Sequence, residues 1–181
     1  MVKELEVKIL NVDIDLMEER IKNLGGELIS KELQVNTLID SYERPIKFYL
    51  DAYLRIRESK DLLNKNETTT FTLKKNIKNN NMRENIELNT NIENKDTMLQ
   101  ILMDLGFDKI SVGHKERTSY ILKGARIDLD IWDKETYPNP YMEIEVDTED
   151  TLDNIINLLN ISKEDVSTKS IVELRKELNL E

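Results

Sequence analysis

Apolar and charged residues alternate most clearly near the start of the chain, in Glu4-Leu5-Glu6-Val7-Lys8. Successive side chains of a β-strand point to opposite faces, so Leu5 and Val7 would share one face and the three charged residues the other. Most antiparallel strands with this pattern simply expose their charges to solvent. The pattern therefore predicts a strand, and it leaves open whether the charges form a site.

Further strands are predicted where apolar and polar residues alternate, or where β-branched and aromatic residues gather. They cover residues 28–39, 53–57, 68–75, 83–88, 112–122, 126–132 and 142–146. The strands 112–122 and 126–132 would form a hairpin that turns at Lys123-Gly124-Ala125. Residues 41–51 and the asparagine-rich segment 76–81 are predicted to be connections.

Residues 13–24 carry apolar side chains at helical spacing, with Asp13 placed to cap the helix and Gly25-Gly26 placed to end it. Further helices are predicted at residues 95–105, 152–159 and 170–178. Helices must bury an apolar face, and the apolar faces of the strands can receive them. These elements predict an α+β fold whose helices cover the apolar side of an antiparallel sheet.

The opposite faces of the strands are rich in charge. Their polar residues are Glu4, Glu6, Lys8, Arg55, Arg57, Thr72, Lys74, Arg83, Asn85, Glu87, Lys115, Arg117, Asp128, Asp130, Glu143 and Glu145. These faces must point away from the helices, either into open solvent or into a shared interior. A sheet closed into a barrel has no free edge and can keep a hydrated interior. Alternation alone does not decide between a curved sheet with a wet outer face and a closed barrel.

The kinds of charge favour an interior site. The acids occur as Glu-x-Glu and Asp-x-Asp pairs, and carboxylate oxygens are the ligands that hard divalent cations prefer. The bases occur separately as Arg-x-Arg and Lys-x-Arg, and an arginine fork binds phosphate through two hydrogen bonds. A triphosphate bound with Mg²⁺ or Mn²⁺ would neutralise both sets.

Composition excludes some other classes of function. The 181 residues are compatible with one domain spanning 1–181, and the net charge of −10 argues against a protein that coats nucleic acid. No apolar run approaches the ~20 residues of a membrane span, so no membrane partner is expected. The chain has no cysteine, and its charged beginning contains no secretory signal. A cytoplasmic location is expected, and a homodimer is left open.

Together these motifs resemble the CYTH superfamily, also called triphosphate tunnel metalloenzymes. The resemblance starts with the Glu-x-Glu-x-Lys signature at residues 4–8 and continues in the family's order along the chain. The later landmarks are Leu54-Arg55-Ile56-Arg57, Thr72-Leu73-Lys74, residues 83–87, Lys115-x-Arg117, Leu129-Asp130 and Met142-Glu143-Ile144-Glu145. The last part, through Trp132, Pro138 and Tyr141, looks most like the CyaB-type branch. The resemblance implies a closed eight-stranded antiparallel β-tunnel with helices packed on the outside.

The resemblance also implies roles for individual residues. The metal would be held by Glu4, Glu6, Glu87, Asp130, Glu143 and Glu145, and phosphates by Lys8, Arg55, Arg57, Lys74, Arg83, Lys115 and Arg117. Glu4, Glu6 and Lys8 would be the catalytic set. Asn85 departs from the family, since many relatives carry a second carboxylate there. Asn36 and Leu38 replace the usual acid and aromatic residue, which leaves a role for Asp40 doubtful.

Members of the family act on triphosphates with a divalent metal, and three readings follow for this chain. A phosphohydrolase acting on inorganic, nucleoside or thiamine triphosphate is preferred, because hydrolysis needs no dedicated base pocket and the sequence shows none. A class IV adenylyl cyclase would use the same phosphate site. A non-catalytic polyphosphate- or nucleotide-binding module is a third reading, because Asn85 weakens the metal set. Crowded carboxylates among Glu4, Glu6, Glu143 and Glu145 are also expected to titrate high without metal.

Overall fold

The computed structural model describes residues 2–77 and 83–180, with side chains described except at residues 2–4 and 83–84. Its strands are β1 (Val2–Ile9), β2 (Glu27–Asp40), β3 (Ala52–Asp61), β4 (Glu67–Ile77), β5 (Arg83–Asn91), β6 (Lys109–Leu122), β7 (Ala125–Trp132), β8 (Tyr141–Val146) and β9 (Val166–Ser167). Its α-helices are α1 (Ile14–Asn23), α2 (Lys47–Leu50), α3 (Lys95–Asp104), α4 (Glu149–Leu158) and α5 (Ile171–Glu177). The predicted turn at 76–81 lies mostly outside the described residues.

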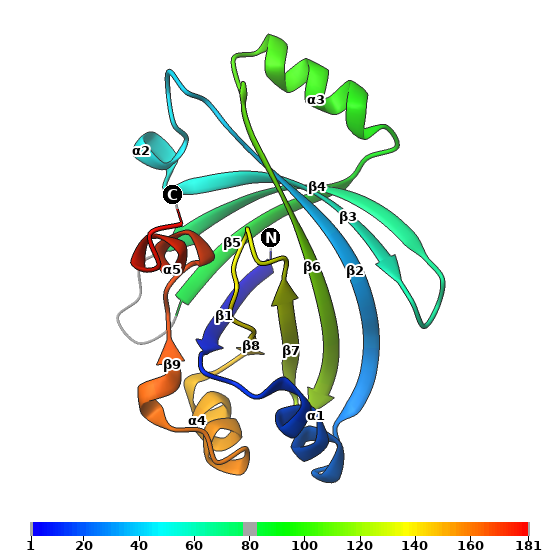
Figure 1. Cartoon of the computed structure of the whole chain (residues 1–181), viewed down its shortest axis with the longest axis vertical. Helices are drawn as coiled ribbons and strands as arrows, with labels where there is room; N and C mark the ends of the chain where they lie inside the picture. The colour runs from blue at the N-terminus through cyan, green and yellow to red at the C-terminus, as the bar shows by residue number, and fades with distance from the viewer. Residues whose placement is uncertain (1, 78–82, 181) are drawn as a thin grey trace.

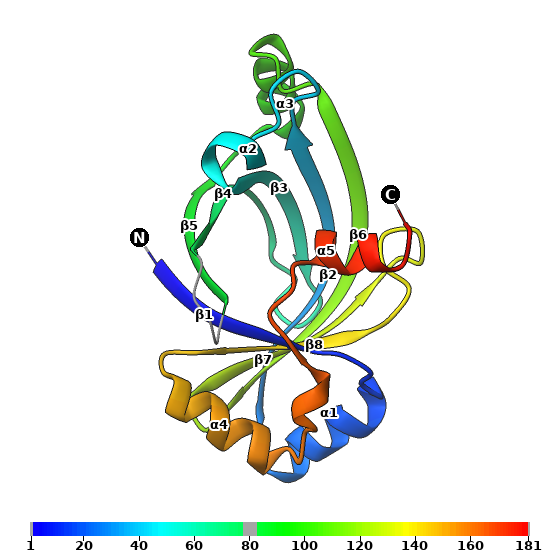
Figure 2. The same cartoon turned by 90° about the vertical axis from the view of Figure 1, so that its left-hand side faces the viewer.

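All strands in the described part of the chain belong to one antiparallel sheet, which curls until its ends meet. The order is β5-β4-β3-β2-β6-β7-β8-β1-β9, and β1 pairs with β8 on one side and with β5 on the other. The β1–β5 contact runs from Val2↔Glu87 to Glu6↔Arg83, so closure involves only the first part of β1. Beyond it, β1 pairs with β9 at Lys8 and Ile9. Strands β1 to β8 thus form the expected tunnel, with β3 and β4 across from β7 and β8 (Figure 2).

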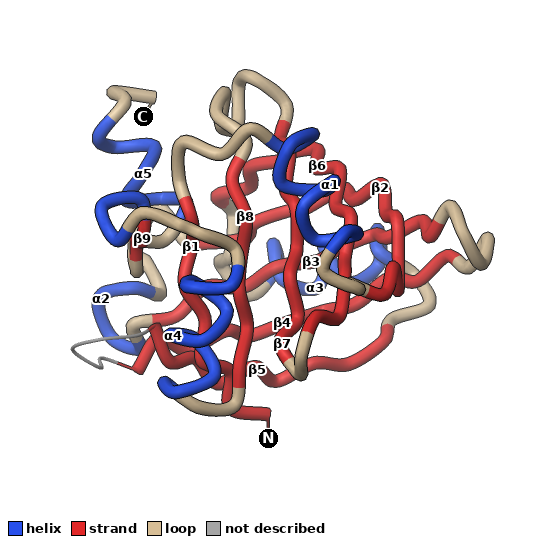
Figure 3. The backbone as a smooth tube through the Cα atoms, turned by 90° about the horizontal axis from the view of Figure 1, so that it is seen from below, coloured by secondary structure: helices blue, strands red, loops and turns tan. Residues whose placement is uncertain are grey.

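Helices cover the outer face of this tunnel. Helices α1 and α4 lie together at the β7–β8 side, and α3 lies at the far end of the molecule near β4 and β6 (Figures 1 and 3). The larger core forms where strand residues such as Val7, Ile127 and Ile144 meet Ile21 of α1 and Ile155 of α4. A second core gathers Ile39, Leu54 and Ile56 against Leu102 of α3. The apolar strand faces therefore point outward, as the predicted layers require.

Local sequence explains where α1 begins and ends. The Asp13 carboxylate accepts a hydrogen bond from the backbone N–H of Leu16 at 3.1 Å, which caps the helix. After the helix the chain turns through Gly25, at φ +84°, a conformation that glycine adopts without strain. A Cβ atom on Gly26 would lie 2.4 Å from a methyl carbon of Ile21. The glycine pair thus lets β2 start directly against the helix.

Two elements differ from the sequence-based prediction. The short helix α2 lies within the predicted connection 41–51, where the Asp40 carboxylate accepts hydrogen bonds from the backbone N–H groups of Ser41 and Ile46 and folds the segment back. Strand β9 has only two residues, too few to show an alternating pattern. No helix in the described residues is both long and apolar enough to cross a bilayer.

Two isoleucines on the outer face of β7 provide a test of how the helices stabilise the tunnel. Ile127 is fully buried in the core under α1 and α4, whereas Ile131, four residues along the same face, is 43% exposed. Ile127→Ala should lower the free energy of unfolding by about 2–5 kcal/mol, because a buried cavity is created. Ile131→Ala should cost under about 1 kcal/mol. Urea denaturation followed by circular dichroism measures both; equal losses would contradict the described layering.

Candidate functional site

The polar strand faces line the inside of the tunnel. The buried polar and charged residues that share this face are Glu6, Lys8, Gln34, Asn36, Thr72, Lys74, Asn85, Lys115, Arg117, Ser119, Asp128 and Asp130. Pairing across the strands sets these residues side by side: Lys8 lies opposite Glu143, and Glu143 lies opposite Asp128. Side chains directly opposite on neighbouring strands have Cβ atoms ~4.5–5.5 Å apart. Residues that are far apart in sequence thus meet in one polar interior.

Arg117 is the centre of the first charge network. Its guanidinium contacts Asp130 at 2.5 and 2.6 Å, Asp128 at 2.6 Å and Glu143 at 2.5 Å. Lys115 donates to the Asp130 carboxylate at 2.9 Å. Lys8 contacts Glu143 at 2.9 Å, so β1 joins this network from the neighbouring strand β8. Asp130 is therefore shared by Arg117 and Lys115, and Glu143 is shared by Arg117 and Lys8.

Lys74 is the centre of a second network on the opposite side of β1. Its ammonium lies 2.8 Å from the Glu87 carboxylate and 3.4 Å from that of Glu6. Asn85, which is fully buried, donates from its amide to Glu6 at 3.1 Å. Asn85 thus holds the predicted catalytic carboxylate Glu6 in place, where a second carboxylate at this position would repel it.

The networks change the titration expected for the carboxylates. Burial raises the pKa of Glu143, but Lys8 and Arg117 outweigh it and hold this pKa well below the usual range. Burial likewise raises the pKa of Glu87, and Lys74 lowers it to about 2. The expectation that crowded carboxylates titrate high is wrong for Glu143, because cations lie between the acids. The pKa of Lys115 falls to about 7, since burial and Arg117 disfavour its charge.

Arg55 and Arg57 differ from the other cations. Neither has a carboxylate within 4.0 Å among the described residues. Arg57 donates from Nε to the amide oxygen of Asn36 at 2.8 Å, and the Arg55 guanidinium lies 5.9 Å from the centre of the Tyr53 ring. Burial and the positive charges of Arg55 and Arg117 lower the pKa of Arg57 to about 9, so it stays cationic at neutral pH. The pair is a local excess of positive charge.

Two buried hydrogen-bond donors, one in this pair and one in the neighbouring Asn36, lack an acceptor. They are Nε of Arg55 and the amide nitrogen Nδ2 of Asn36. A buried donor without a partner costs free energy, so a ligand or a water molecule commonly supplies the acceptor for such a group in native proteins. Here the missing acceptor would lie beside two guanidinium groups. This arrangement fits an anion with several oxygens.

The structure brings most of the predicted site residues together in these three groups. Lys8, Arg117, Lys115, Asp130 and Glu143 share the first network, and Glu6, Lys74 and Glu87 the second. The side chains of Glu4 and Arg83 lie outside the described residues, although their backbones pair with Asn85 and Glu6. Glu145 lies directly opposite Glu6 on β8.

Several interior residues were missing from the sequence-based site. Asn36 and Gln34 are buried in the tunnel, and Asn89, which is exposed, links Thr72 to Glu87 through hydrogen bonds of 2.7 and 3.1 Å. Alternation along residues 32–36 would have placed Gln34 and Asn36 on the polar face. Amides carry no charge, so the pairs of acids and bases that indicate the other site residues do not extend to them.

The carboxylates on β1 and β8 are ligands that a hard divalent cation prefers, and strand pairing brings them close to one another. Glu6 and Glu145 lie opposite each other on β1 and β8, and Glu4 precedes Glu6 by two residues on β1. Among the side chains that the structure describes, no three His, Cys, Asp or Glu groups are yet close enough to hold a metal ion. The contacts above explain this in part, because the carboxylates of Glu6, Glu87, Asp130 and Glu143 already contact a lysine, an arginine or an amide. A metal would have to replace part of these contacts.

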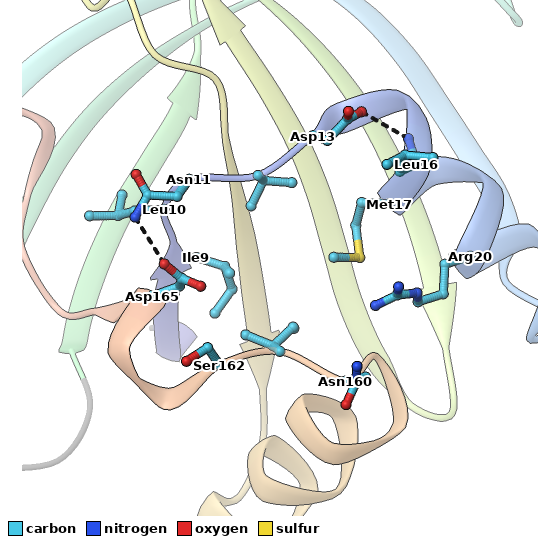
Figure 4. A pocket seen from close by; sticks show the side chains of 12 residues that line it. Ile9, Leu10, Asn11, Asp13, Leu16, Met17, Arg20, Asn160, Ser162 and Asp165 are labelled. Carbon is cyan, nitrogen blue, oxygen red and sulfur yellow. Dashed lines mark hydrogen bonds between the residues drawn. The ribbon is translucent and has the colours of Figure 1, made fainter.

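A separate small cavity of about 190 Å³ lies outside the tunnel, where the end of β1 meets α1 and residues 160–165. Asn11 donates to Asp165 at 2.9 Å across its rim (Figure 4). Arg20 lines the cavity but donates to the backbone carbonyl of Leu159 at 2.5 Å. These contacts tie the segment after α4 to β1 and α1. None of the predicted site residues lines this cavity.

Comparison with known proteins agrees with the fold. The CYTH domain family matches residues 2–171, so the chain belongs to the CYTH family. A protein of Methanocaldococcus jannaschii named "Putative adenylate cyclase" is 31% identical to this chain. The alignment covers 95% of this chain and 98% of that protein.

Solved structures share the architecture. The PH1819 protein from Pyrococcus horikoshii OT3 superposes with a TM-score of 0.76 at 25% identity, over 97% of this chain and 99% of that one. A Hippeastrum protein described as a "Putative adenylyl cyclase" with "a dominant triphophatase activity" has a TM-score of 0.64 at 12% identity, over 94% of this chain and 91% of that one. At this identity the likeness shows the shared fold.

Asn36 offers a test of the excess charge at the arginine pair. Asn36→Asp keeps the size of the side chain but puts a carboxylate 2.8 Å from Nε of Arg57. Because of the new ion pair, the variant should be at least as stable as the wild type. It should bind tripolyphosphate about tenfold more weakly, because ~1.4 kcal/mol of attraction between the anion and Arg57 is lost. Asn66→Asp, in the exposed β3–β4 turn, is the matched control. Calorimetric titration with tripolyphosphate measures the change; undiminished affinity in Asn36→Asp would rule out an anion at Arg57.

Proposed function

We propose that this protein is a divalent-metal-dependent phosphohydrolase that binds triphosphates inside the tunnel. The observation that carries the proposal is the pair Arg55 and Arg57, which lacks a carboxylate partner among the described residues. Nε of Arg55 and the amide nitrogen of the neighbouring Asn36 also lack an acceptor. Guanidinium groups bind phosphate oxygens through paired hydrogen bonds. The other interior cations already have carboxylates, so the arginine pair is the natural point of entry for an anion.

The remaining cations would bind the rest of the triphosphate chain. Lys8, Lys74 and Arg117 are held in the interior by carboxylates, so their positions are fixed before a substrate arrives. Prearranged charges lower the cost of reorganisation when negative charge builds up on a leaving phosphate. Arg117 and Lys115 would approach the triphosphate from β6, and Lys8 would approach it from β1. The substrate would thus be contacted from several sides.

The metal-side residues of this proposal are Glu4, Glu6 and Glu145, with Glu143 next to them. A bound Mg²⁺ or Mn²⁺ would polarise phosphoryl oxygens and offset charge on the leaving group. Lys74 and Asn85 orient Glu6, and Lys8 holds Glu143. Asp130 and Glu87 belong to the proposed metal set by family resemblance only, and their contacts with Arg117 and Lys74 fit counter-ions that hold the cations.

A second candidate function is formation of cyclic AMP and pyrophosphate from ATP. It is favoured by the 31% identity with the relative named "Putative adenylate cyclase". The same phosphate contacts would serve both reactions, with the 3′-hydroxyl of ATP attacking instead of water. A binding module without turnover is the third candidate, because Asn85 stands in place of a carboxylate.

A turnover screen separates these candidates. The protein is incubated with ATP, thiamine triphosphate and inorganic triphosphate in the presence of Mg²⁺ or Mn²⁺, and free phosphate, pyrophosphate and cyclic AMP are resolved. Release of phosphate supports the phosphohydrolase. Cyclic AMP with pyrophosphate identifies a cyclase instead. Tight binding without any product leaves the binding module, and absence of binding contradicts all three.

Arg57 can be tested by a change that keeps its charge. Arg57→Lys should weaken tripolyphosphate binding by about tenfold while the melting temperature of the free protein changes little, because an ammonium cannot make the two-pronged contact. Arg57→Ala should bind more weakly still. Arg44→Lys, at an exposed arginine stacked on Tyr49, is the control. Melting curves with and without tripolyphosphate provide the measurement; ligand-induced stabilisation equal to wild type in both variants would place Arg57 outside the phosphate site.

Glu6 tests the metal-side role. Glu6→Gln keeps the shape and can still accept from Asn85, but it removes the charge that a metal needs. Activity with Mg²⁺ should fall at least ~10-fold, which corresponds to ~1.4 kcal/mol of transition-state stabilisation. The protein should remain folded, since Glu6 lies outside the apolar core. Glu67→Gln, at an exposed glutamate paired with Lys60, serves as control. Full activity of Glu6→Gln would contradict the role of Glu6 on the metal side of the site.

A further inference from the structure

Part of the outer face of the sheet lies between the helices that cover the rest. Helices α1 and α4 pack on one part of that face and α3 on another, and strands β2 and β6 cross the front of the molecule between them (Figure 1). Among the described residues, neither of the two cores includes Leu33 or Val35 of β2. Leu33 is 44% exposed, and Ile131 of β7 and Val112 of β6 are 43% and 53% exposed on the same face. Contiguous exposed apolar residues of this kind commonly mark an interaction surface.

Opposite charges flank Leu33 on the two neighbouring strands. Leu33 pairs with Glu116 of β6 and with Lys60 of β3, so the three side chains form one row across the outer face. Both flanking residues are exposed. Lys60 also lies 3.0 Å from Glu67 of β4, but an ion pair between such exposed groups contributes little, and the lysine can still contact a further carboxylate.

A second row lies two residues further along β2. Val35 pairs with His114 of β6 and with Glu58 of β3. His114 is exposed, and the side chain of Glu58 is 41% exposed although Lys95 contacts it at 2.6 Å. An imidazole N–H can donate a hydrogen bond to a carboxylate. The two rows together are called the β2 face, which consists of Leu33, Val35, Glu58, Lys60, His114 and Glu116.

The β2 face is complementary to itself under a two-fold rotation. An axis that runs along β2 in the plane of contact lays β2 of one copy on β2 of the other, and the β6 side on the β3 side. Glu116 then meets Lys60 of the second copy, and His114 meets its Glu58. Because the rotation is two-fold, each of these contacts is made twice. The apolar residues of β2 meet their own counterparts, which gives the contact an apolar centre and a polar rim.

The overall charge of the chain favours this arrangement of two copies over others. Each copy has a net charge of −10, so two copies repel each other in most orientations. At the β2 face the two rows instead bring an acid to a base and a hydrogen-bond donor to an acid. Sheets that pack face to face keep their strands within about 30° of each other, which is compatible with β2 lying on β2.

We propose that the protein forms a two-fold symmetric dimer through the β2 face. The inference goes beyond the proposed function and does not depend on it, because Asn36 and Arg57 lie on the inner side of the same strands. On β3, Arg57 and Glu58 are consecutive and point to opposite sides of the sheet. The dimer would therefore support, from outside, the strands that hold the arginine pair.

Charge reversal across the proposed axis tests the inference, with sedimentation velocity of the full chain over a series of concentrations giving the dissociation constant of the dimer. Lys60→Glu and Glu116→Lys should each raise this constant at least about tenfold, because each change places like charges together twice. An equal mixture of the two variants should recover the dimer, since the heterodimer pairs Glu with Lys at both contacts. An effect confined to one chain cannot produce this recovery. Lys163→Glu, at an exposed lysine beyond α4, is the matched control.

The apolar centre is tested separately. Leu33→Asp should abolish the dimer, because it places two carboxylates together at the axis, whereas Leu16→Asp, at a 63% exposed leucine of α1, should leave it unchanged. Melting temperatures show that each variant is folded. Tripolyphosphate binding should be the same in all of these variants, since the β2 face lies outside the tunnel.

Each outcome decides the inference. A wild type that sediments as a monomer at every concentration overturns it. A dimer that persists unchanged in Lys60→Glu, Glu116→Lys and Leu33→Asp uses another surface and also overturns it, as does a mixture of the two charge variants that stays monomeric. Failure of the wild type to bind tripolyphosphate would overturn the proposed function and leave the dimer in place.

Discussion

Pairing of opposite charges across neighbouring strands holds the tunnel interior together. Burying an ionised side chain is costly unless a partner compensates it. The closed ring provides the partners by register, since Lys8 lies opposite Glu143 and Arg117 opposite Asp130. The helices contribute by covering the outer, apolar faces, so that the polar faces of the strands turn inward. Apolar packing outside and ion pairing inside are therefore two results of the same alternation.

Arg55 and Arg57 are the exception to this pairing, and they make the charge of the interior uneven. Asn36 takes the position where the resemblance leads one to expect an acid, and it offers Arg57 a neutral oxygen instead of a charge. Positive charge without a described carboxylate partner thus lies at β3, while the interior cations Lys8, Lys74 and Arg117 are paired with carboxylates. A polyanion is complementary to the charge at β3, because its phosphates can bind there without displacing a carboxylate.

Much of this could be read from the sequence because it depends on local patterns. Alternation placed the strands and their faces, and the capping residue Asp13 and the glycines after it placed the ends of α1. The partners of individual charges could not be predicted, because Arg117 meets Glu143 through the order and register of strands far apart in sequence. The two-residue β9 and the short α2 carry too little periodicity to be recognised.

The central position of β1 also has a consequence for how the chain reaches this structure. The strand pairs with β5, β8 and β9, all of which follow it at long range along the sequence. Folding that depends on such distant pairings is slow, because the intervening chain must lose its freedom before the contacts can form. During synthesis, β1 precedes all three partners, so it stays unpaired at least until β5 has emerged and gains β8 and β9 only after that. The strand that carries Glu6 and Lys8 therefore completes its pairing late.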